Sequence, residues 1–142
     1  MMYSAEAEKA VLGAMLLDSQ AISAGSALDP GDLYLDSHRA IYTAIRRLYS
    51  TGANVDFMSV RLELERTKQL DSVGGFGYVM SLEEGIPRRY DVTRFVAVIR
   101  EKATLRRIVS MCEYAAERAA LDDSSEDILH DLQGMALQQQ AA

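Results

Sequence analysis

One long stretch without a helix breaker limits what this chain can fold into. Residues 91–120 contain neither Gly nor Pro, and Ala, Arg and Glu, which favour helix, are frequent in them. As a single helix they would be about 45 Å long at 1.5 Å per residue. The turn-forming residues 122–125 follow, and residues 124–127 resemble a capping box that starts another helix. The C-terminal part therefore predicts a long helix that folds back on a shorter one, with a fraying tail at 138–142.

Shorter helices are expected before this hairpin, because Gly and Pro separate segments with apolar residues at helical spacing. Alternating apolar and polar residues with β-branched side chains, the pattern of a strand, are not evident. We therefore predict an all-α single domain over 1–142, with a compact multi-helix head at about 1–86 and the hairpin at about 87–142. The expected helices of the head are 5–17 with Ser4 as N-cap, 21–28, one after Asp36 as N-cap and ending before Gly52, 57–68 with Asp56 as N-cap, and a short one around Tyr78 that ends at Gly85.

The helix after Asp36 has a predicted buried face. Its apolar residues share one side at helical spacing; they are Ile41, Ala44, Ile45, Leu48 and Tyr49. The triplet Asp36-Ser37-His38 contains the residue types of a catalytic triad. Consecutive positions on a helix point in different directions, so these three cannot form a relay among themselves. His38 is therefore interpreted as a packed or surface residue.

Composition and motifs argue against catalysis by this chain. The 142 residues carry 15 Lys+Arg against 21 Asp+Glu, a net charge of -6, which disfavours strong direct binding to DNA. The sequence has no P-loop, no second His or Cys at metal-ligand spacing and only one cysteine, Cys112. Cys112 is expected to be a small core hydrophobe. No catalytic, cofactor-binding or metal-binding residue is therefore predicted.

Two classes of function remain open from the residues alone. One is a helical interaction module, and the other is an enzyme with an unrecognised carboxylate site. The absence of clustered Asp, Glu or His favours the first. The short apolar run 10–17 follows acidic rather than basic residues, which is unlike a signal peptide, and no segment approaches the ~20 apolar residues of a membrane span. A cytoplasmic protein with no membrane partner is expected.

The hairpin is the candidate surface for self-association. Its long helix carries more apolar positions than one short helix can cover, and soluble monomers tend to avoid such exposed strips. A two-fold contact between two hairpins would cover the strip; the alternative is that the head folds over it within one chain. The residues proposed for this interface are Leu105, Ile108, Val109, Cys112, Ala115, Ala116 and Ala119 on the long helix, with Ile128, Leu132 and Met135 on the closing helix.

Several sequence blocks, taken in order, resemble the N-terminal domain of bacterial replicative DNA helicases, the DnaB family. Each block is weak alone, but together they cover nearly the whole chain. They are EAE at 6–8 with VLGAML at 11–16, DLY at 32–34 with HRAIY at 38–42, residues 48–52 with Val55-Asp56, VGG at 73–75 with Tyr78, Ile86-Pro87, and residues 95–103 with LRR at 105–107. The chain departs from the family in MMYS at 1–4 and LDS at 35–37, which leaves the partner surfaces open.

The resemblance implies a role in assembling a hexameric helicase ring, by way of dimers, and in docking primase and other replication proteins. It also implies that ATP, Mg²⁺ and the helicase activity belong to a separate RecA-like domain, so that this chain alone would be no enzyme and would need no cofactor. Two alternatives stay open: a helicase-binding domain of a primase, whose fold is similar, or an unrelated all-α regulator. Residues 100–103 favour the helicase side over the primase side.

Overall fold

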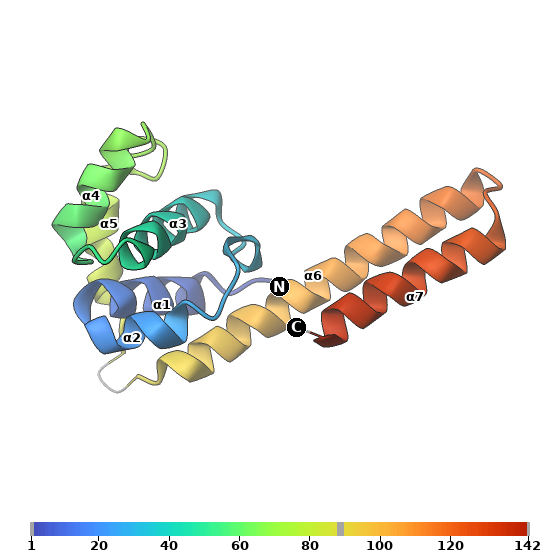
Figure 1. Ribbon diagram of the computed structural model, residues 1–142, viewed down its shortest axis with the longest axis horizontal. Helices are drawn as coiled ribbons and strands as arrows, with labels where there is room; N and C mark the ends of the chain where they lie inside the picture. Colours follow the sequence, from blue (N-terminus) through green and yellow to red (C-terminus); the bar gives the residue numbers. More distant parts are fainter. Residues whose placement is uncertain (1, 88–89, 142) are drawn as a thin grey trace. The chain divides into compact units, whose positions relative to one another are not determined.

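The computed structural model describes residues 2–87 and 90–141, and in them the fold is all-α (Figure 1). This confirms the predicted fold class. The helices occur in the order α1 (Ala5–Leu17), α2 (Ser19–Gly25), η1 (Pro30–Asp32), α3 (Asp36–Ser50), α4 (Phe57–Arg66), α5 (Gly75–Ser81), η2 (Leu82–Gly85), α6 (Val92–Ala120) and α7 (Ser125–Ala141). By its internal contacts the chain forms two compact units, Met1–Ala103 and Thr104–Ala142, which we call the head and the hairpin.

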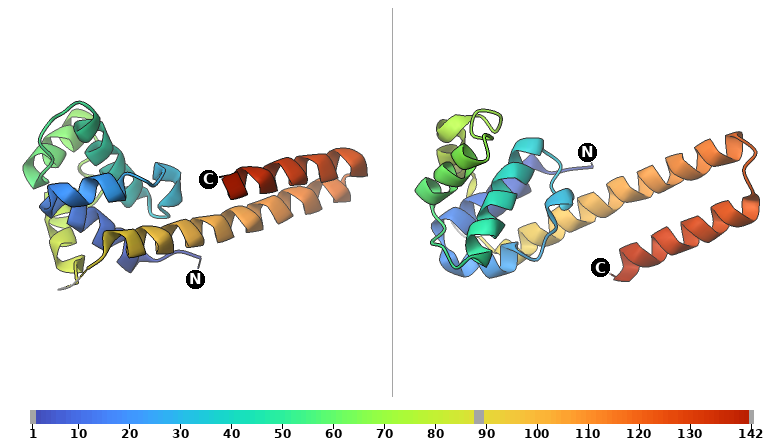
Figure 2. Two further views of the ribbon diagram at one scale, coloured as in Figure 1. Left: turned by 60° about the horizontal axis from the view of Figure 1, so that its bottom comes forward. Right: turned by 45° about the horizontal axis from the view of Figure 1, so that its top comes forward.

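Helix α1 is the centre of the head. The Ser4 side chain accepts a hydrogen bond from the Ala7 N–H, as an N-cap should. Beyond the first turn nearly every residue of α1 is buried, with Val11, Leu12 and Met15 fully enclosed. Such a helix must be covered on all sides, and α2, α3 and η2 pack against it (Figure 1, Figure 2).

Two predicted helix starts need correction. Helix α2 begins at Ser19 rather than near residue 21, because Asp18 caps it by accepting from the Gln20 N–H at 2.9 Å. Helix α3 has Leu35, not Asp36, at its N-cap position, and no side chain of its own caps it. Asp36 lies inside the first turn, where it pairs with Arg39.

The buried face of α3 is rotated from the expected one. Ile41, Ala44 and Ile45 are buried as predicted, but Leu48 is only half-buried and Tyr49 is exposed. Tyr42 is fully buried instead. Its hydroxyl lies 2.8 and 2.7 Å from the Gly25 and Leu28 carbonyl oxygens. The periodicity would place this hydroxyl near the surface, but it is hydrogen-bonded inside the head.

The second half of the head is fixed by a cap and by a close backbone approach. Asp56 and Ser59 form a capping box at the start of α4, which confirms Asp56 as the N-cap. Helix α5 and the 3-10 turn η2 then bring the chain back onto α1. A Cβ on Gly13 would lie 2.3 Å from the Leu82 carbonyl oxygen, so only glycine at this position allows η2 to touch α1.

The head extends further along the chain than the boundary near residue 86 that Pro87 suggested. The first turns of α6 bury Val92, Val96 and Ile99 in the core of the head, and the compact unit ends at Ala103. The Arg100 guanidinium donates to the Ala27 carbonyl at 2.7 Å. The beginning of the long helix is therefore part of the head's structure.

The hairpin consists of the rest of α6 and of α7, which lie side by side and antiparallel (Figure 1, Figure 2). Asp122 takes a positive φ of 59° at the turn, and the Asp127 N–H donates to Ser124 Oγ at 3.3 Å. Of the tail 138–142, α7 includes the residues up to Ala141, and residue 142 lies outside the described residues. Over the described residues, none of the helices has the length and apolar character needed to cross a membrane.

Candidate interaction surface on the helical hairpin

Most of the predicted interface residues of α6 are exposed. Ile108 is 45% exposed, Val109 38% and Leu105 37%, and Cys112, Ala116 and Ala119 are also exposed. These residues recur at spacings of three and four and so form one stripe along the helix. The hairpin unit leaves this stripe uncovered.

The other predicted interface residues close the hairpin itself. Ile128 is buried, and Ala115, Leu132 and Met135 are half-buried between α6 and α7. Met111, which is outside the predicted set, is half-buried as well. These five residues form the inner seam of the hairpin and are less available to a partner than the exposed stripe.

Helix α7 extends the exposed stripe of α6. Leu129, 66% exposed, and Ala136 lie about 100° around α7 from Ile128 and Met135. The α6 stripe lies at a similar angle, in the same rotational sense, from Met111 and Ala115. In an antiparallel pair, equal rotations from the seam fall on one side. Eight described residues thus share one apolar face of the hairpin, and Leu121 and Leu137 are exposed outside it. The face consists of Leu105, Ile108, Val109, Cys112, Ala116 and Ala119 of α6 and Leu129 and Ala136 of α7.

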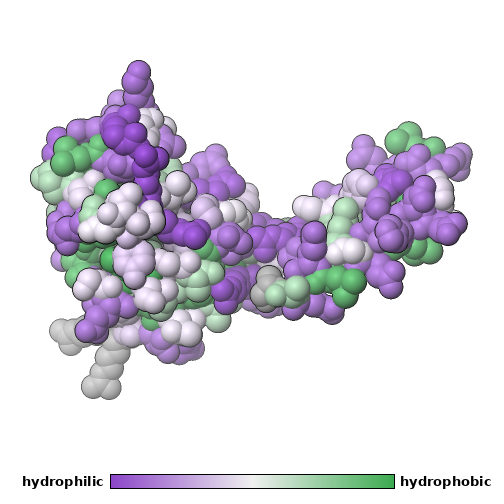
Figure 3. Space-filling model, viewed as in Figure 1, coloured by the Kyte–Doolittle hydropathy of each residue, from purple (hydrophilic) through white to green (hydrophobic). Residues whose placement is uncertain are grey.

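The opposite side of the hairpin is polar. Tyr114 lies about 200° around α6 from both Cys112 and Ala116, and its hydroxyl is 3.2 Å from an Asp131 carboxylate oxygen. Arg118 donates to Asp123, to the Tyr114 hydroxyl and to Asp131. The hydrogen bond to Asp123 contributes most to a raised pKa of Arg118. In the view of Figure 3, purple hydrophilic side chains cover much of the hairpin, with green apolar side chains among them.

The placement of Cys112 corrects the sequence interpretation. The thiol was expected in a core, but Cys112 is free and exposed. Its helical spacing places Cys112 on the apolar stripe with Ile108 and Ala116. Helix α7 packs against the neighbouring Met111 and Ala115 side, which leaves Cys112 on the part of the stripe that α7 does not cover.

The head contains a buried polar chain that crosses three helices. Glu8 of α1, 1% exposed, lies 2.8 Å from His38 Nδ1 of α3. His38 Nε2 is 2.6 Å from the Tyr78 hydroxyl of α5. The prediction that Asp36-Ser37-His38 forms no relay is consistent with this arrangement, because His38 is packed and bonds to other helices. Sequence reasoning missed Glu8, whose spacing from the apolar residues of α1 was the available signal.

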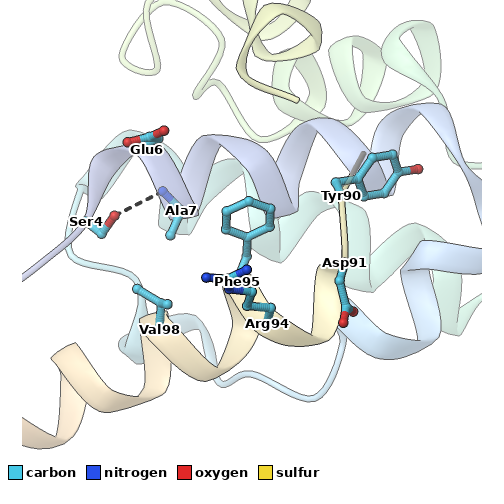
Figure 4. A pocket seen from close by; sticks show the side chains of 8 residues that line it. All are labelled: Ser4, Glu6, Ala7, Tyr90, Asp91, Arg94, Phe95 and Val98. Carbon is cyan, nitrogen blue, oxygen red and sulfur yellow. Dashed lines mark hydrogen bonds between the residues drawn. The ribbon is translucent and has the colours of Figure 1, made fainter. Parts of the chain in front are cut away.

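A hollow of about 490 Å³ lies between the first turns of α1 and α6 in the head (Figure 4). Its apolar lining comes from Ala7, Phe95 and Val98, and charged side chains of both signs surround it. Figure 4 shows Phe95 directed toward α1, with the Ser4 cap beside it. Ser4 Oγ accepts from a backbone N–H, and no histidine lines the hollow, so the lining does not have the arrangement of an activated nucleophile.

The fold and the hairpin define a small all-α domain whose exposed apolar face is typical of proteins that associate. The sequence profile described as "DnaB-like helicase N terminal domain" matches residues 1–101. The chain therefore belongs to the DnaB-like helicase N-terminal domain family, as its resemblance indicated.

Relatives and a solved structure agree with this assignment. The chain is 34% identical over 129 residues to the replicative DNA helicase DnaB of Geobacillus stearothermophilus, covering 90% of this chain and 28% of that protein. It is 34% identical over 128 residues to the replicative DNA helicase DnaC of Bacillus subtilis, covering 89% of this chain and 28% of that protein. The crystal structure of the N-terminal domain of DnaB helicase from Mycobacterium tuberculosis superposes with a TM-score of 0.86 at 30% identity, covering 96% and 97% of the two chains.

The chain thus spans little more than a quarter of the length of these two helicases. It corresponds to the N-terminal domain of a DnaB-type replicative helicase. This assignment favours a helicase domain over the two alternatives, a helicase-binding domain of a primase and an unrelated all-α regulator.

Proposed function

We propose that this domain is a non-catalytic assembly and docking module of a cytoplasmic replicative helicase. Its hairpin pairs with the hairpin of a second copy, and such dimers build the helicase ring. The observation that supports this most directly is the apolar face, which places Leu105, Ile108 and Val109 in solvent within the hairpin unit. Covering such a face in a symmetric pair removes the same patch from water on both partners.

Sedimentation equilibrium of the wild type and of Ile108→Asp tests the pairing. Ile108 is the more exposed of the large residues on the α6 stripe, so the variant should fold normally and shift to monomer. Leu132→Asp should also weaken pairing, but Leu132 contributes to the inner seam, so that variant would disturb the hairpin too. The matched control is Leu62→Asp on α4 of the head, since Leu62 is 58% exposed but lies on the other unit.

The outcome is decided by comparing these proteins at equal concentration. A wild type that remains monomeric at high micromolar concentration would contradict the pairing. So would an Ile108→Asp variant that is folded by circular dichroism and still dimeric.

Cys112 offers a second readout of the same contact, because it is exposed and lies within the apolar face. Its reaction with a thiol reagent should be fast at nanomolar protein concentration and slow as pairs form. The rate should stay fast at all concentrations in Ile108→Asp. A rate independent of concentration in the wild type, under conditions where the protein is dimeric, would place the dimer contact elsewhere.

We further propose that the domain docks primase and other replication proteins, and that ATP and Mg²⁺ bind elsewhere in the full-length helicase. Family membership supports the docking proposal, and the lack of a P-loop in this sequence supports the proposal that ATP and Mg²⁺ bind elsewhere. Titration calorimetry of the chain with the helicase-binding domain of primase tests the docking. ATPase activity in a preparation free of contaminating enzymes would overturn the second proposal.

A further inference from the structure

A second stripe of residues runs along the first turns of α6, in the head. Asp91, immediately before the helix, is followed by Phe95, Val98 and Lys102 at spacings of four, three and four, so all four share one side of α6. At 100° per residue they fall within about 60° of one another, and their centre lies about 100° around α6 from that of its buried residues. This set, which we call the head stripe, therefore lies beside the core-facing side of the helix.

The head stripe borders the hollow between α1 and α6. Phe95 and Val98 pack against the core but are only half-buried, and both line the hollow with Ala7 (Figure 4). Asp91 is exposed at one end of the stripe, and Lys102 is half-buried at the other. The hollow measures about 490 Å³, which is enough to receive apolar side chains from another helix.

The head stripe matches a second copy of itself that runs in the opposite direction. Its order is acidic, apolar, apolar, basic, and the spacings of four, three and four stay the same when they are reversed. When two stripes lie antiparallel, Phe95 of each copy faces Val98 of the other, and Asp91 of each copy faces Lys102 of the other. This is the pattern of a two-fold contact, in which residue i meets residue j and j meets i.

Charge selects the antiparallel direction. Two parallel stripes would place Asp91 against Asp91 and Lys102 against Lys102, and such like-charge contacts are unfavourable. The antiparallel arrangement instead pairs opposite charges at both ends and leaves the apolar residues between them. The stripe therefore carries the charge pattern of its own partner, which favours a second copy of this chain over an unrelated helix.

We propose that the head stripe is a second self-association contact, through which the head of one copy binds the head of another in antiparallel orientation. This inference rests on the proposed function, because hairpin pairs supply the copies that the head contact joins. Four residues on each copy are far fewer than the roughly 20–30 residues a side of a stable interface. The head contact is therefore too small to hold two free copies together, and it forms when hairpin pairing raises the effective concentration of heads, as in a closed ring.

Sedimentation velocity of the whole chain over a range of concentrations tests the head contact. The wild type should form assemblies larger than two copies. Lys102→Glu faces Asp91 of the second copy and should shift these assemblies to roughly 2- to 30-fold higher concentration, because the symmetry removes two ion pairs at once. Ile108→Asp should stay monomeric. Failure of the hairpin pairing thus appears as monomers of the wild type, whereas failure of the head contact appears as a wild type that stops at two copies.

A mixture of two variants tests the pairing of opposite charges. Asp91→Lys and Lys102→Glu should each assemble poorly alone, since each places like charges at both ends of the contact. Mixed in equal amounts they regain opposite charges at both ends, so the larger assemblies should return. The matched control is Asp71→Lys, which makes the same charge change at an exposed carboxylate after α4 and should assemble like wild type.

A further variant covers a folding defect in Asp91→Lys, because Asp91 accepts a hydrogen bond from the Thr93 N–H at 3.0 Å at the start of α6. Asn can keep this role, so Asp91→Asn combined with Lys102→Glu removes the repulsion and should assemble better than Lys102→Glu alone. Circular dichroism checks that each variant is folded. The proposal is overturned by a folded Lys102→Glu that assembles like wild type, or by neither the mixture nor the double variant regaining the larger assemblies.

Discussion

A pair of identical substitutions should change stability in opposite directions. Gly13 lies inside α1 and Gly134 inside α7, so alanine would favour the helix at both positions by roughly 0.8–1.0 kcal/mol. The surroundings differ. A Cβ on Gly134 meets nothing within 4 Å, whereas a Cβ on Gly13 would lie 2.3 Å from the Leu82 oxygen and 2.9 Å from Ile86 Cγ1.

The magnitudes follow from these contacts. Gly134→Ala should stabilise the hairpin by about 0.5–1 kcal/mol. Alanine favours the helix over glycine by about this amount, chiefly because it gives the unfolded chain fewer conformations. Gly13→Ala must separate η2 from α1 by a fraction of an ångström or more, because the contacted atom is a backbone oxygen. Overpacking of a core typically costs about 1–3 kcal/mol, so this variant should be destabilised despite its better helix propensity.

Urea denaturation followed by far-ultraviolet circular dichroism, with tyrosine signals as a second probe, measures both effects. Two probes are needed because the head and the hairpin are separate compact units and their transitions need not coincide. Gly134 is off the apolar face, so its variant should associate like wild type. The reasoning is refuted if Gly13→Ala is as stable as wild type, or if Gly134→Ala lowers the denaturation midpoint.

Three further predictions concern the core. Ile41→Ala and Ile45→Ala should each lower the free energy of unfolding by about 2–5 kcal/mol, because both side chains are fully buried, while the half-buried Leu48→Ala should cost less. Tyr42→Phe should cost about 1–3 kcal/mol by leaving the Gly25 and Leu28 carbonyls without the hydroxyl donor, again by urea denaturation. Burial raises the pKa of Tyr42 to about 12, so the fold favours the protonated phenol; about 3 kcal/mol of stability present below pH 10 should be lost between pH 10 and 12, and alkaline titration of Tyr42→Phe should lack this loss.

The elements of this fold were largely readable from the sequence because their ends carry local signals. Ser4 and Asp56 cap their helices through contacts within one turn, and the run from 91 to 120 has no breaker. Leu35 could not be recognised as an N-cap position, because the group that serves it is Glu8, 27 residues earlier. Tyr42 was missed for the same reason, since its hydroxyl partners lie in the loop after α2.

The sequence predicts which apolar residues of α6 belong to the candidate surface, but not which of them face α7. Spacing along α6 identifies Ile108, Cys112 and Ala115 as one apolar set, yet α7 covers only part of it. Which part is covered depends on the angle at which the turn at Asp122 returns the chain. Leu129 escaped the prediction because it is adjacent to Ile128 in sequence and only the packed structure separates the covered residue from the exposed one.

The two sides of the hairpin differ in polarity, and this difference limits how many copies of the hairpin can bind to one another. One side is apolar, while the other holds the Tyr114, Arg118 and Asp131 network, whose polar groups already bond to one another. A two-fold contact made by the apolar face alone would saturate at two copies and would not polymerise into open fibres. Under the proposed pairing, growth from pairs to a closed ring would require a second contact elsewhere on the protein. Substitutions on the apolar face of the hairpin would then change pair formation without altering that second contact, so the proposal predicts that pair formation and ring closure can be changed separately.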